Sequence, residues 1–272
     1  MVKLKLVKMK ILLKLAILAP TIVSYNIASS QITTIWLTHK TNKPSHIVVN
    51  WESKVAGNSE VYFGTSTNYE CSIKKNENVS IHHVEIPLDK KDVIYHYMVK
   101  TNNEKSSDNT FKAYPSKSNE LRIAVVGNWG YSENIDFTAL IKDNPHLLMT
   151  CGDNVANLHA LCGQGVNDCV KPYLELIASQ KQLFSSTPFM PILGNHDKEI
   201  RNRDTKYPEI TSYDTNATAF RKFFELPGDE WKCVFRIPNF NVTFIALDIQ
   251  HISDFGTTWQ TCHDFHRCSD QF

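Results

Sequence analysis

Residues 147–154 read LLMTCGDN and residues 188–197 read PFMPILGNHD, and each stretch places a polar turn directly after a short apolar run. A third stretch, RIAVVGNWG at 122–130, has the same form. Helical patterns at 133–143, 170–184 and 216–226 alternate with these runs. One more strand-like run follows at 241–249. Strands that alternate with helices predict a largely parallel, layered α/β domain.

The polar residues after these runs form a candidate site. In α/β domains, sites lie where loops leave the carboxyl ends of the strands, and Asn128, Asp153 and Asn195 all have that position. Asp153 offers a charged oxygen able to bridge two cations, and Asn195 offers a neutral amide oxygen. His196 can reach a bound substrate as a proton donor. Asp197 either orients His196 through a hydrogen bond or holds the turn.

The same residue types also occur for purely structural reasons. Asp, Asn and Gly are frequent after strands because they tolerate tight backbone geometry. A single GDN or GNHD would therefore be weak evidence for a site. The two together, preceded by GNWG at a suitable interval, are much stronger evidence.

Residues 31–113 have a different pattern, with several short runs rich in β-branched and aromatic residues. Turn residues separate the runs at 42–44, 56–58 and 89–92, which predicts a β-sandwich. The histidines in this part are expected to be cross-strand surface residues rather than ligands; they are His46, His82, His83 and His96. A polar segment, YPSKSNE at 114–120, separates the two patterns and predicts a linker.

The first thirty residues have the layout of a secretory signal. A basic stretch precedes an apolar one, and small residues at 28–30 suit cleavage. The apolar stretch is too short for a stable membrane span, and an uncleaved N-terminal anchor is the alternative. The chain is therefore expected to be secreted or extracytoplasmic. Loss of the five lysines of this segment, from 29 basic and 28 acidic residues, leaves a net charge of −4. No basic patch is present, so nucleic acid is not an expected partner.

Seven cysteines in a secreted chain predict disulfides and one remaining thiol. We expect local pairs between Cys162 and Cys169 and between Cys262 and Cys268. The second pair also brackets His263 and His266, so a zinc site there is the alternative to a disulfide. Cys151 ends an apolar run and is expected to be a buried thiol.

The motifs at 152–154 and 194–197 resemble those of the calcineurin-like metallophosphoesterases, and the whole chain resembles the purple acid phosphatase group most. In that family the aspartate matching Asp153 bridges two metals, and the asparagine matching Asn195 binds the second. The histidine matching His196 contacts phosphate and helps to protonate the leaving group. The resemblance implies hydrolysis of phosphate esters by metal-activated hydroxide, with a divalent or mixed-valence pair of Fe, Zn or Mn.

Two substitutions depart from the family pattern. The first family motif is Asp-x-Gly, whereas this chain has Asn128-Trp129-Gly130. Asparagine keeps the shape and one oxygen but not the negative charge, so a cation at the first metal site is expected to bind more weakly. The purple enzymes have a tyrosine three residues after the bridging aspartate. Here that residue is Ala156, so no charge-transfer colour is expected.

The resemblance implies four segments: a signal peptide at 1–30, a fibronectin-III-like sandwich at 31–113, a linker at 114–120, and a phosphoesterase domain at 121–272. The family's later histidine motifs do not occur in the sequence, so the last domain, an αββα sandwich, is expected to be incomplete at its C-terminus. A weakly active or inactive enzyme is then expected. A non-catalytic binding protein of the same fold, or a gene fragment, is the alternative. The sequence does not indicate the oligomeric state.

Overall fold

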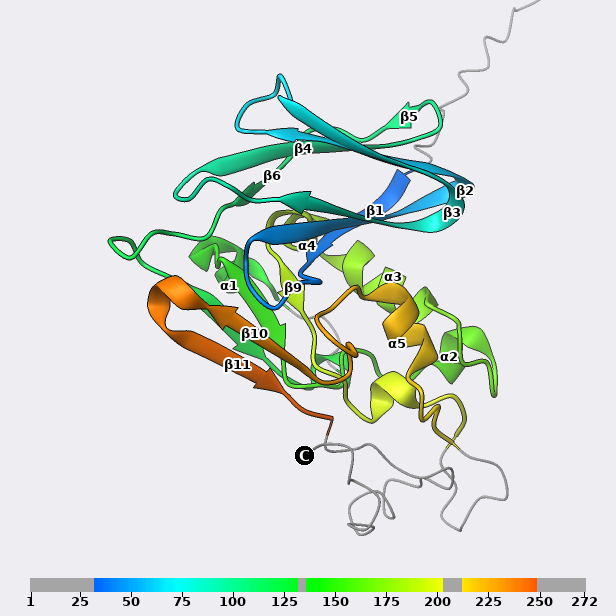
Figure 1. Ribbon diagram of the computed structural model, residues 1–272. Coiled ribbons are helices and arrows are strands. Elements are labelled where there is room, and N and C mark those ends of the chain that lie inside the picture. The colour runs from blue at the N-terminus through cyan, green and yellow to red at the C-terminus, as the bar shows by residue number, and fades with distance from the viewer. Residues whose placement is uncertain (1–31, 132–135, 203–211, 249–272) are drawn as a thin grey trace, which may run out of the picture.

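The computed structural model describes residues 32–131, 136–202 and 212–248 (Figure 1). The expected signal segment lies outside these ranges, and so does the Cys262–Cys268 pair with its two histidines. Within the described ranges, no helix has the length and apolar character needed to cross a membrane.

The N-terminal sheet, residues 32–112, contains only antiparallel strand pairs. Its strands are β1 (Ile32–Thr38), β2 (His46–Gly64), β3 (Cys71–Pro87), β4 (Ile94–Thr101), β5 (Glu104–Lys105) and β6 (Asn109–Lys112). The long strand β2 is central, because it pairs with β1, β3 and β4. Alternate residues of these strands are buried, and they include Leu37, Val49, Trp51, Val61 and Tyr97.

The turn expected at Ala56–Asn58 is wrong, since β2 continues through these residues. Its register against β3 shifts on both sides of Gly57, which marks an irregularity of the β-bulge type. A bulge bends a strand and increases its twist. As a result the first half of β2 pairs with β1 and the second half pairs with β4, so one strand serves two parts of the sheet.

His82 is buried, in contrast to the surface position expected for it. Its ring stacks on Trp51, with the ring centroids 4.5 Å apart. The ring nitrogens lie 2.7 Å from Oγ of Ser53 and 2.6 Å from Oγ of Ser59. His82 is therefore a core residue whose two nitrogens have partners, and alternation within the strand alone did not reveal this.

Three short parallel strands follow, in the order β7-β8-β9, and they confirm the expected parallel arrangement. They are β7 (Ile123–Val126), β8 (Leu147–Thr150) and β9 (Phe189–Met190). All four residues of the central strand β8 are buried, as is typical of a parallel strand covered on both faces. The run at 241–249 does not extend this sheet. Instead β11 (Val242–Ala246) pairs antiparallel with β10 (Cys233–Ile237) in a separate two-stranded sheet.

The helices within the described ranges are few and short. They are η1 (Trp129–Tyr131), α1 (Thr138–Asp143), α2 (His159–Cys162), α3 (Lys171–Ser179), α4 (Lys181–Ser186), η2 (His196–Lys198), α5 (Thr218–Phe223) and η3 (Pro238–Phe240). Pro172 lies in the first turn of α3, where its missing N–H costs nothing. The single helix expected at 170–184 is broken at Gln180, whose φ and ψ of −140° and 56° are not helical.

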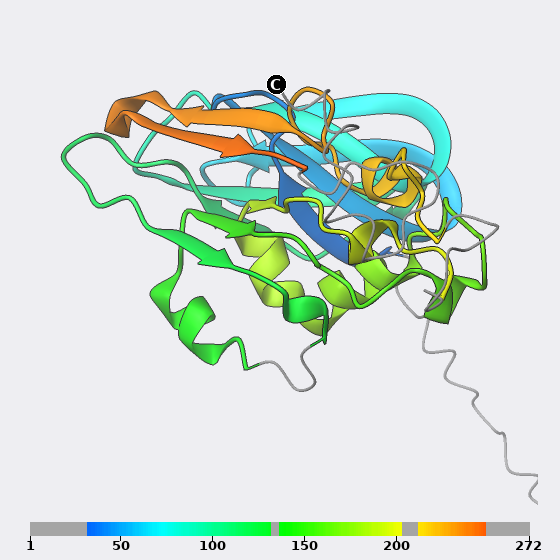
Figure 2. The same cartoon turned by 90° about the horizontal axis from the view of Figure 1, so that it is seen from below.

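The N-terminal sheet packs on the α/β part, with β1 against α3, α4 and β9 and with β6 against α4 (Figures 1 and 2). Trp36 of β1 stacks on Phe223 of α5 with ring centroids 4.2 Å apart and planes 9° apart. Both side chains are fully buried and belong to the core of the α/β part. Tyr97 adds a hydrogen bond of 2.6 Å from its hydroxyl to the carbonyl of Ser185. The N-terminal sheet therefore has a core of its own and adds Trp36 to the core of the α/β part.

His39 lies at the same junction and is fully buried. One ring nitrogen is 2.7 Å from the carbonyl of His46, the other is 3.1 Å from the hydroxyl of Tyr114, and the ring stacks on Phe235. Burial lowers the pKa of His39 to about 4, although the contact with the His46 carbonyl opposes the shift. In the unfolded chain His39 binds a proton near pH 6.5, whereas in the folded chain it stays neutral down to about pH 4. The contribution of neutral His39 to the stability of the fold is therefore present above pH 6.5 and is lost as the pH falls toward 4.

We predict that His39→Phe removes this acid sensitivity. The ring still packs on Phe235 but cannot titrate, so the variant is less stable than the wild type at pH 7.5 and the deficit shrinks by about 2 kcal/mol at pH 5. Urea denaturation of both proteins at the two pH values measures the change. Because the comparison is a difference of differences, other titrating groups cancel. An equal deficit at both pH values would contradict the neutral, buried state of His39.

Candidate functional site

Three turns meet at one edge of the parallel sheet, where β7, β8 and β9 end. They carry the residues singled out from the sequence. The N–H of Asn128 donates to the carbonyl of Gly152 over 3.2 Å, and the N–H of Gly130 donates to the carbonyl of Asp153 over 3.0 Å. The first two turns are thus joined by backbone hydrogen bonds, which fixes their relative position.

Asn128 and Asp153 have the same unusual backbone, with φ values of 55° and 54°. This left-handed region is costly for most residues, but Asn and Asp visit it readily because their short polar side chains can bond locally. The backbone of the first turn therefore accepts either residue. The aromatic ring of Trp129 is buried against Phe189 and anchors this turn to the core.

The third turn approaches the second so closely that residue 194 must be glycine. A Cβ atom there would lie 2.2 Å from both the backbone nitrogen and Oδ1 of Asp153. The N–H of His196 donates to Oδ1 of Asp153 over 3.2 Å. The structure therefore brings Asp153 and His196 together, with Asn195 between Gly194 and His196 in the chain.

Asp197 holds the turn, which was one of the two roles considered for it. Its carboxylate accepts hydrogen bonds from the N–H of Gly194 at 2.8 Å and from the side-chain amide of Asn154 at 2.9 Å. The N–H of Asn154 adds a weaker contact at 3.2 Å. Burial raises the pKa of Asp197 to about 7, and these donors oppose the shift. Asp197 thus links the second and third turns, and Asn154 is a partner that the sequence did not single out.

The side chain beside His196 is Glu199, which the sequence analysis missed. Nδ1 of His196 lies 2.9 Å from Oε2 of Glu199, and Nε2 of His159 lies 3.4 Å from Oε1. The i,i+3 spacing of a histidine and a carboxylate in GNHDKE is the one sequence signal that could have indicated the pair.

A buried ion pair connects the third turn to the two-stranded sheet of β10 and β11. Nζ of Lys198 lies 2.9 Å from Oδ2 of Asp248, and the two side chains are 3% and 1% exposed. Asp248 follows β11, so the pair holds the end of that strand against the GNHD turn. A buried ion pair adds little net stability but is costly to break, because the remaining charge would be unpaired.

The expected metal ligands form an oxygen-donor set with only one charge. In the described part of the chain, no three His, Cys, Asp or Glu side chains are grouped so that they could hold a metal ion. Asp153 offers a carboxylate, while Asn195 and the exposed Asn128 offer amides. Nδ2 of Asn195 is buried and has no hydrogen-bond partner among the described residues. Since amide oxygen and nitrogen are assigned from their hydrogen bonds, the Asn195 amide is equally well placed with its oxygen inward. Carboxylate and amide oxygens are donor types that suit a hard divalent cation.

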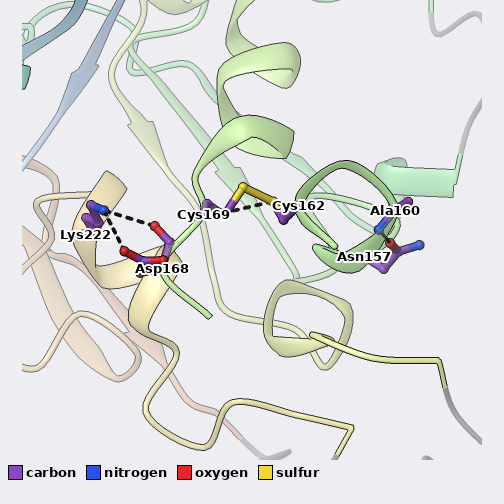
Figure 3. The surroundings of a disulfide bond; sticks show 6 residues. All are labelled: Asn157, Ala160, Cys162, Asp168, Cys169 and Lys222. Atoms are coloured by element: carbon purple, nitrogen blue, oxygen red, sulfur yellow. Dashed lines mark hydrogen bonds and ion pairs between the residues drawn. A yellow bond between two sulfur atoms is a disulfide. The ribbon is translucent and has the colours of Figure 1, made fainter. Parts of the chain in front are cut away.

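The cysteine expectations have mixed outcomes. Cys162 and Cys169 form the expected disulfide (Figure 3). The figure also shows Asp168, beside Cys169, in contact with Lys222 near the end of α5. Cys151 is exposed rather than buried, because the strand ends at Thr150 and Cys151 belongs to the turn.

We predict that Asp197→Ala lowers the free energy of unfolding by about 3 kcal/mol or more, because it leaves buried donors of Gly194 and Asn154 unpaired. Urea denaturation at pH 7.5 measures the loss. Asp168→Ala is the matched control, since it removes an exposed carboxylate whose ion pair contributes about 1 kcal/mol or less. Equal effects of the two substitutions would show that Asp197 does not hold the turn.

Comparison with known proteins bears on both parts of the chain. The solved structure of PhoD matches with a TM-score of 0.59 and 14% identity, covering 83% of this chain and 53% of that chain. This chain therefore spans about half the length of PhoD, and the likeness at this identity concerns the fold. The third fibronectin III domain of the human KIAA0343 protein matches 33% of this chain and 89% of its own length, with 14% identity. Its TM-score of 0.21 is too low to establish a shared fold. None of the curated protein sequences compared with the chain matches it.

The family model of the calcineurin-like phosphoesterases matches residues 107–258. That range is more than half of the chain and contains all three turns of the site. The fold match to PhoD agrees with it. The chain belongs to the calcineurin-like phosphoesterase family.

Proposed function

We propose that this protein is a secreted, metal-dependent phosphoesterase of the purple acid phosphatase type, incomplete at its C-terminus, that hydrolyses phosphate esters weakly. The observation that carries the proposal is the junction of Asp153, Asn195 and His196 at the ends of adjacent parallel strands, where the carboxylate of Asp153 accepts the N–H of His196. This backbone contact supports a site in which Asp153 is a cation ligand and His196 a proton donor.

The chain is divided into four segments in this proposal, as the sequence indicates. Residues 1–30 are a signal peptide, 31–113 a fibronectin-III-like domain, 114–120 a linker and 121–272 the catalytic domain. The antiparallel pairing of all strands before residue 113 supports the second assignment. The Cys162–Cys169 disulfide supports secretion, because disulfides persist in oxidising compartments.

The site residues have distinct roles in this proposal. Asp153 and Asn195 hold a divalent cation, and Asn128 faces a second, weaker position. Carboxylate and amide oxygens suit Mn²⁺ better than they suit Fe or Zn in such a set. When bound, the metal supplies positive charge for the phosphoryl oxygens and lowers the pKa of a water molecule.

His196 provides the second half of the reaction. Its protonated ring contacts the phosphoryl group and gives its proton to the leaving-group oxygen as the P–O bond breaks. A hydroxide derived from water bonds to phosphorus, and the electron pair of the breaking P–O bond stays with the leaving-group oxygen, so the products are an alcohol and phosphate. His196 is 7% exposed, which limits competition from water for its proton.

The direct test is hydrolysis of p-nitrophenyl phosphate by the purified secreted chain with Mn²⁺. We predict that Asp153→Asn lowers kcat/KM at least about 100-fold, because the cation loses its only carboxylate from the three turns. Chelation of the metal should have the same effect on the wild type. Asp168→Asn is the control and should leave the rate unchanged. Phosphate binding without turnover in the wild type would instead identify a non-catalytic binding protein of this fold.

Asn128→Asp should strengthen the site. The backbone φ of 55° suits aspartate as well as asparagine, so the substitution adds a negative charge without strain. We predict Mn²⁺ affinity at least about tenfold higher, measured by calorimetry, and a higher kcat/KM at low metal concentration. Asn157→Asp adds the same charge in the neighbouring segment as a control. Equal gains in both variants would mean that residue 128 does not face the cation.

A further inference from the structure

Glu199 lies between two histidines in the interior of the site. Its carboxylate is 2.9 Å from Nδ1 of His196 and 3.4 Å from Nε2 of His159. The side chains of Glu199, His196 and His159 are 6%, 9% and 10% exposed. A buried carboxylate is costly unless charged or hydrogen-bonding groups compensate it, so the position of Glu199 beside two imidazoles has a physical reason.

The backbone of Glu199 is fixed on both sides. Its N–H donates to the carbonyl of His196 over 3.2 Å, and its carbonyl accepts the N–H of Leu158 over 2.9 Å. Glu199 also forms a β-bridge with Tyr213. Because the main chain cannot shift easily, the carboxylate has a defined place from which to hold a neighbouring ring.

The disulfide-closed loop places the second histidine. His159 begins α2, which ends at Cys162 of the disulfide. Nδ1 of His159 lies 3.2 Å from the side-chain nitrogen of Gln164, and Oε1 of Gln164 accepts the N–H of Asn202 over 3.1 Å. The loop is thereby connected to the segment that follows Glu199, and His159 is held against the carboxylate.

Asp197 was one candidate for the residue that orients His196, but its carboxylate binds other groups. Its carboxylate accepts the N–H of Gly194 and the side-chain amide of Asn154. Glu199 is the carboxylate next to the His196 ring. The 2.9 Å approach of Oε2 to Nδ1 is an ion-pair contact that restrains this nitrogen. Because the two nitrogens lie on opposite sides of one rigid ring, it restrains the direction of Nε2 as well.

We propose that Glu199 is the positioning residue that aims Nε2 of His196 at the leaving-group oxygen, with His159 holding Glu199 from the other side. This role rests on the proposed phosphoesterase function. As a hydroxide derived from water bonds to phosphorus and the P–O bond to the leaving group breaks, the Nε2 proton passes to the leaving-group oxygen and His196 becomes neutral.

The proposal also specifies the class of substrate. Aryl leaving groups such as nitrophenolate depart without a proton, whereas an alkoxide leaves only when protonated. A buried carboxylate devoted to the proton donor therefore favours phosphate monoesters of alcohols over activated aryl esters.

The test compares glycerol 2-phosphate with p-nitrophenyl phosphate in the full chain with Mn²⁺. Glu199→Gln should lower kcat for glycerol 2-phosphate about 100-fold and kcat for the aryl ester less than about fivefold, with KM little changed. His196→Asn should show the same substrate pattern. In the double variant, Glu199→Gln should cause no further loss, because it acts through a ring that is absent. Asp168→Asn is the control for both substrates.

A thermal melt checks that Glu199→Gln folds. If it does not, His159→Gln replaces it, because this variant keeps the Glu199–His196 contact and removes one supporting partner. It should lower kcat for glycerol 2-phosphate about fivefold to tenfold and leave the aryl ester unaffected. Equal losses on both substrates, or additive losses in the double variant, would overturn the positioning role.

Inorganic phosphate binding, measured by calorimetry, separates this proposal from the proposed function. If the wild-type chain binds phosphate but hydrolyses neither substrate, the proposed phosphoesterase function is wrong. The phosphate affinity of the variants then tests the positioning role of Glu199. Glu199→Gln should then weaken phosphate binding about tenfold, with no additional loss in the double variant with His196→Asn. Unchanged phosphate affinity in Glu199→Gln would overturn the role of Glu199.

Discussion

The site depends on the hydrogen bonds of one residue, Asp153. Its backbone carbonyl accepts the N–H of Gly130 from the first turn, and its carboxylate accepts the N–H of His196 from the third. The left-handed backbone at Asp153 directs these two groups to opposite neighbours. A single residue in the middle strand's turn therefore fixes the positions of both flanking turns, which otherwise belong to strands only four and two residues long.

Buried acidic groups surround this junction, and each has a different partner. Asp197 binds N–H donors of the turns, Glu199 lies between imidazoles, and Asp248 pairs with Lys198. Three adjacent residues, 197–199, thus connect this segment to the second turn, to α2 and to the end of β11. Buried polar contacts of this kind favour one geometry, because other arrangements leave a buried charge without compensation.

The sequence predicts the parallel strands and the edge at which Asn128, Asp153 and Asn195 meet, because apolar runs followed by Gly and a polar residue have strong local signals. The disulfide between Cys162 and Cys169 is also local, and its prediction is confirmed. The pairing of β11 with β10 and the break at Gln180 were not predicted, since both depend on tertiary packing rather than on periodicity.

The site shows the same limit. The type of residue at 153, 195 and 196 is visible in the sequence, but the partner of each is not. Asp197 has two plausible partners from spacing alone, and only the fold reveals that it faces Asn154. His159 is forty residues from Glu199 in the chain, so no local pattern could connect them. Partner choice is a property of the folded network and not of the motif.

The stack of Trp36 on Phe223 has a consequence for how such a protein can evolve. A β-rich N-terminal module is often exchanged between proteins by recombination, because an independent domain brings its own core. Here the module supplies a fully buried indole to the core of its neighbour. A chain that inherited the α/β part alone would expose the faces of Phe223 and the aromatic cluster around it. The two parts are therefore expected to be inherited together. Substitutions at residues 36 and 223 are expected to be correlated.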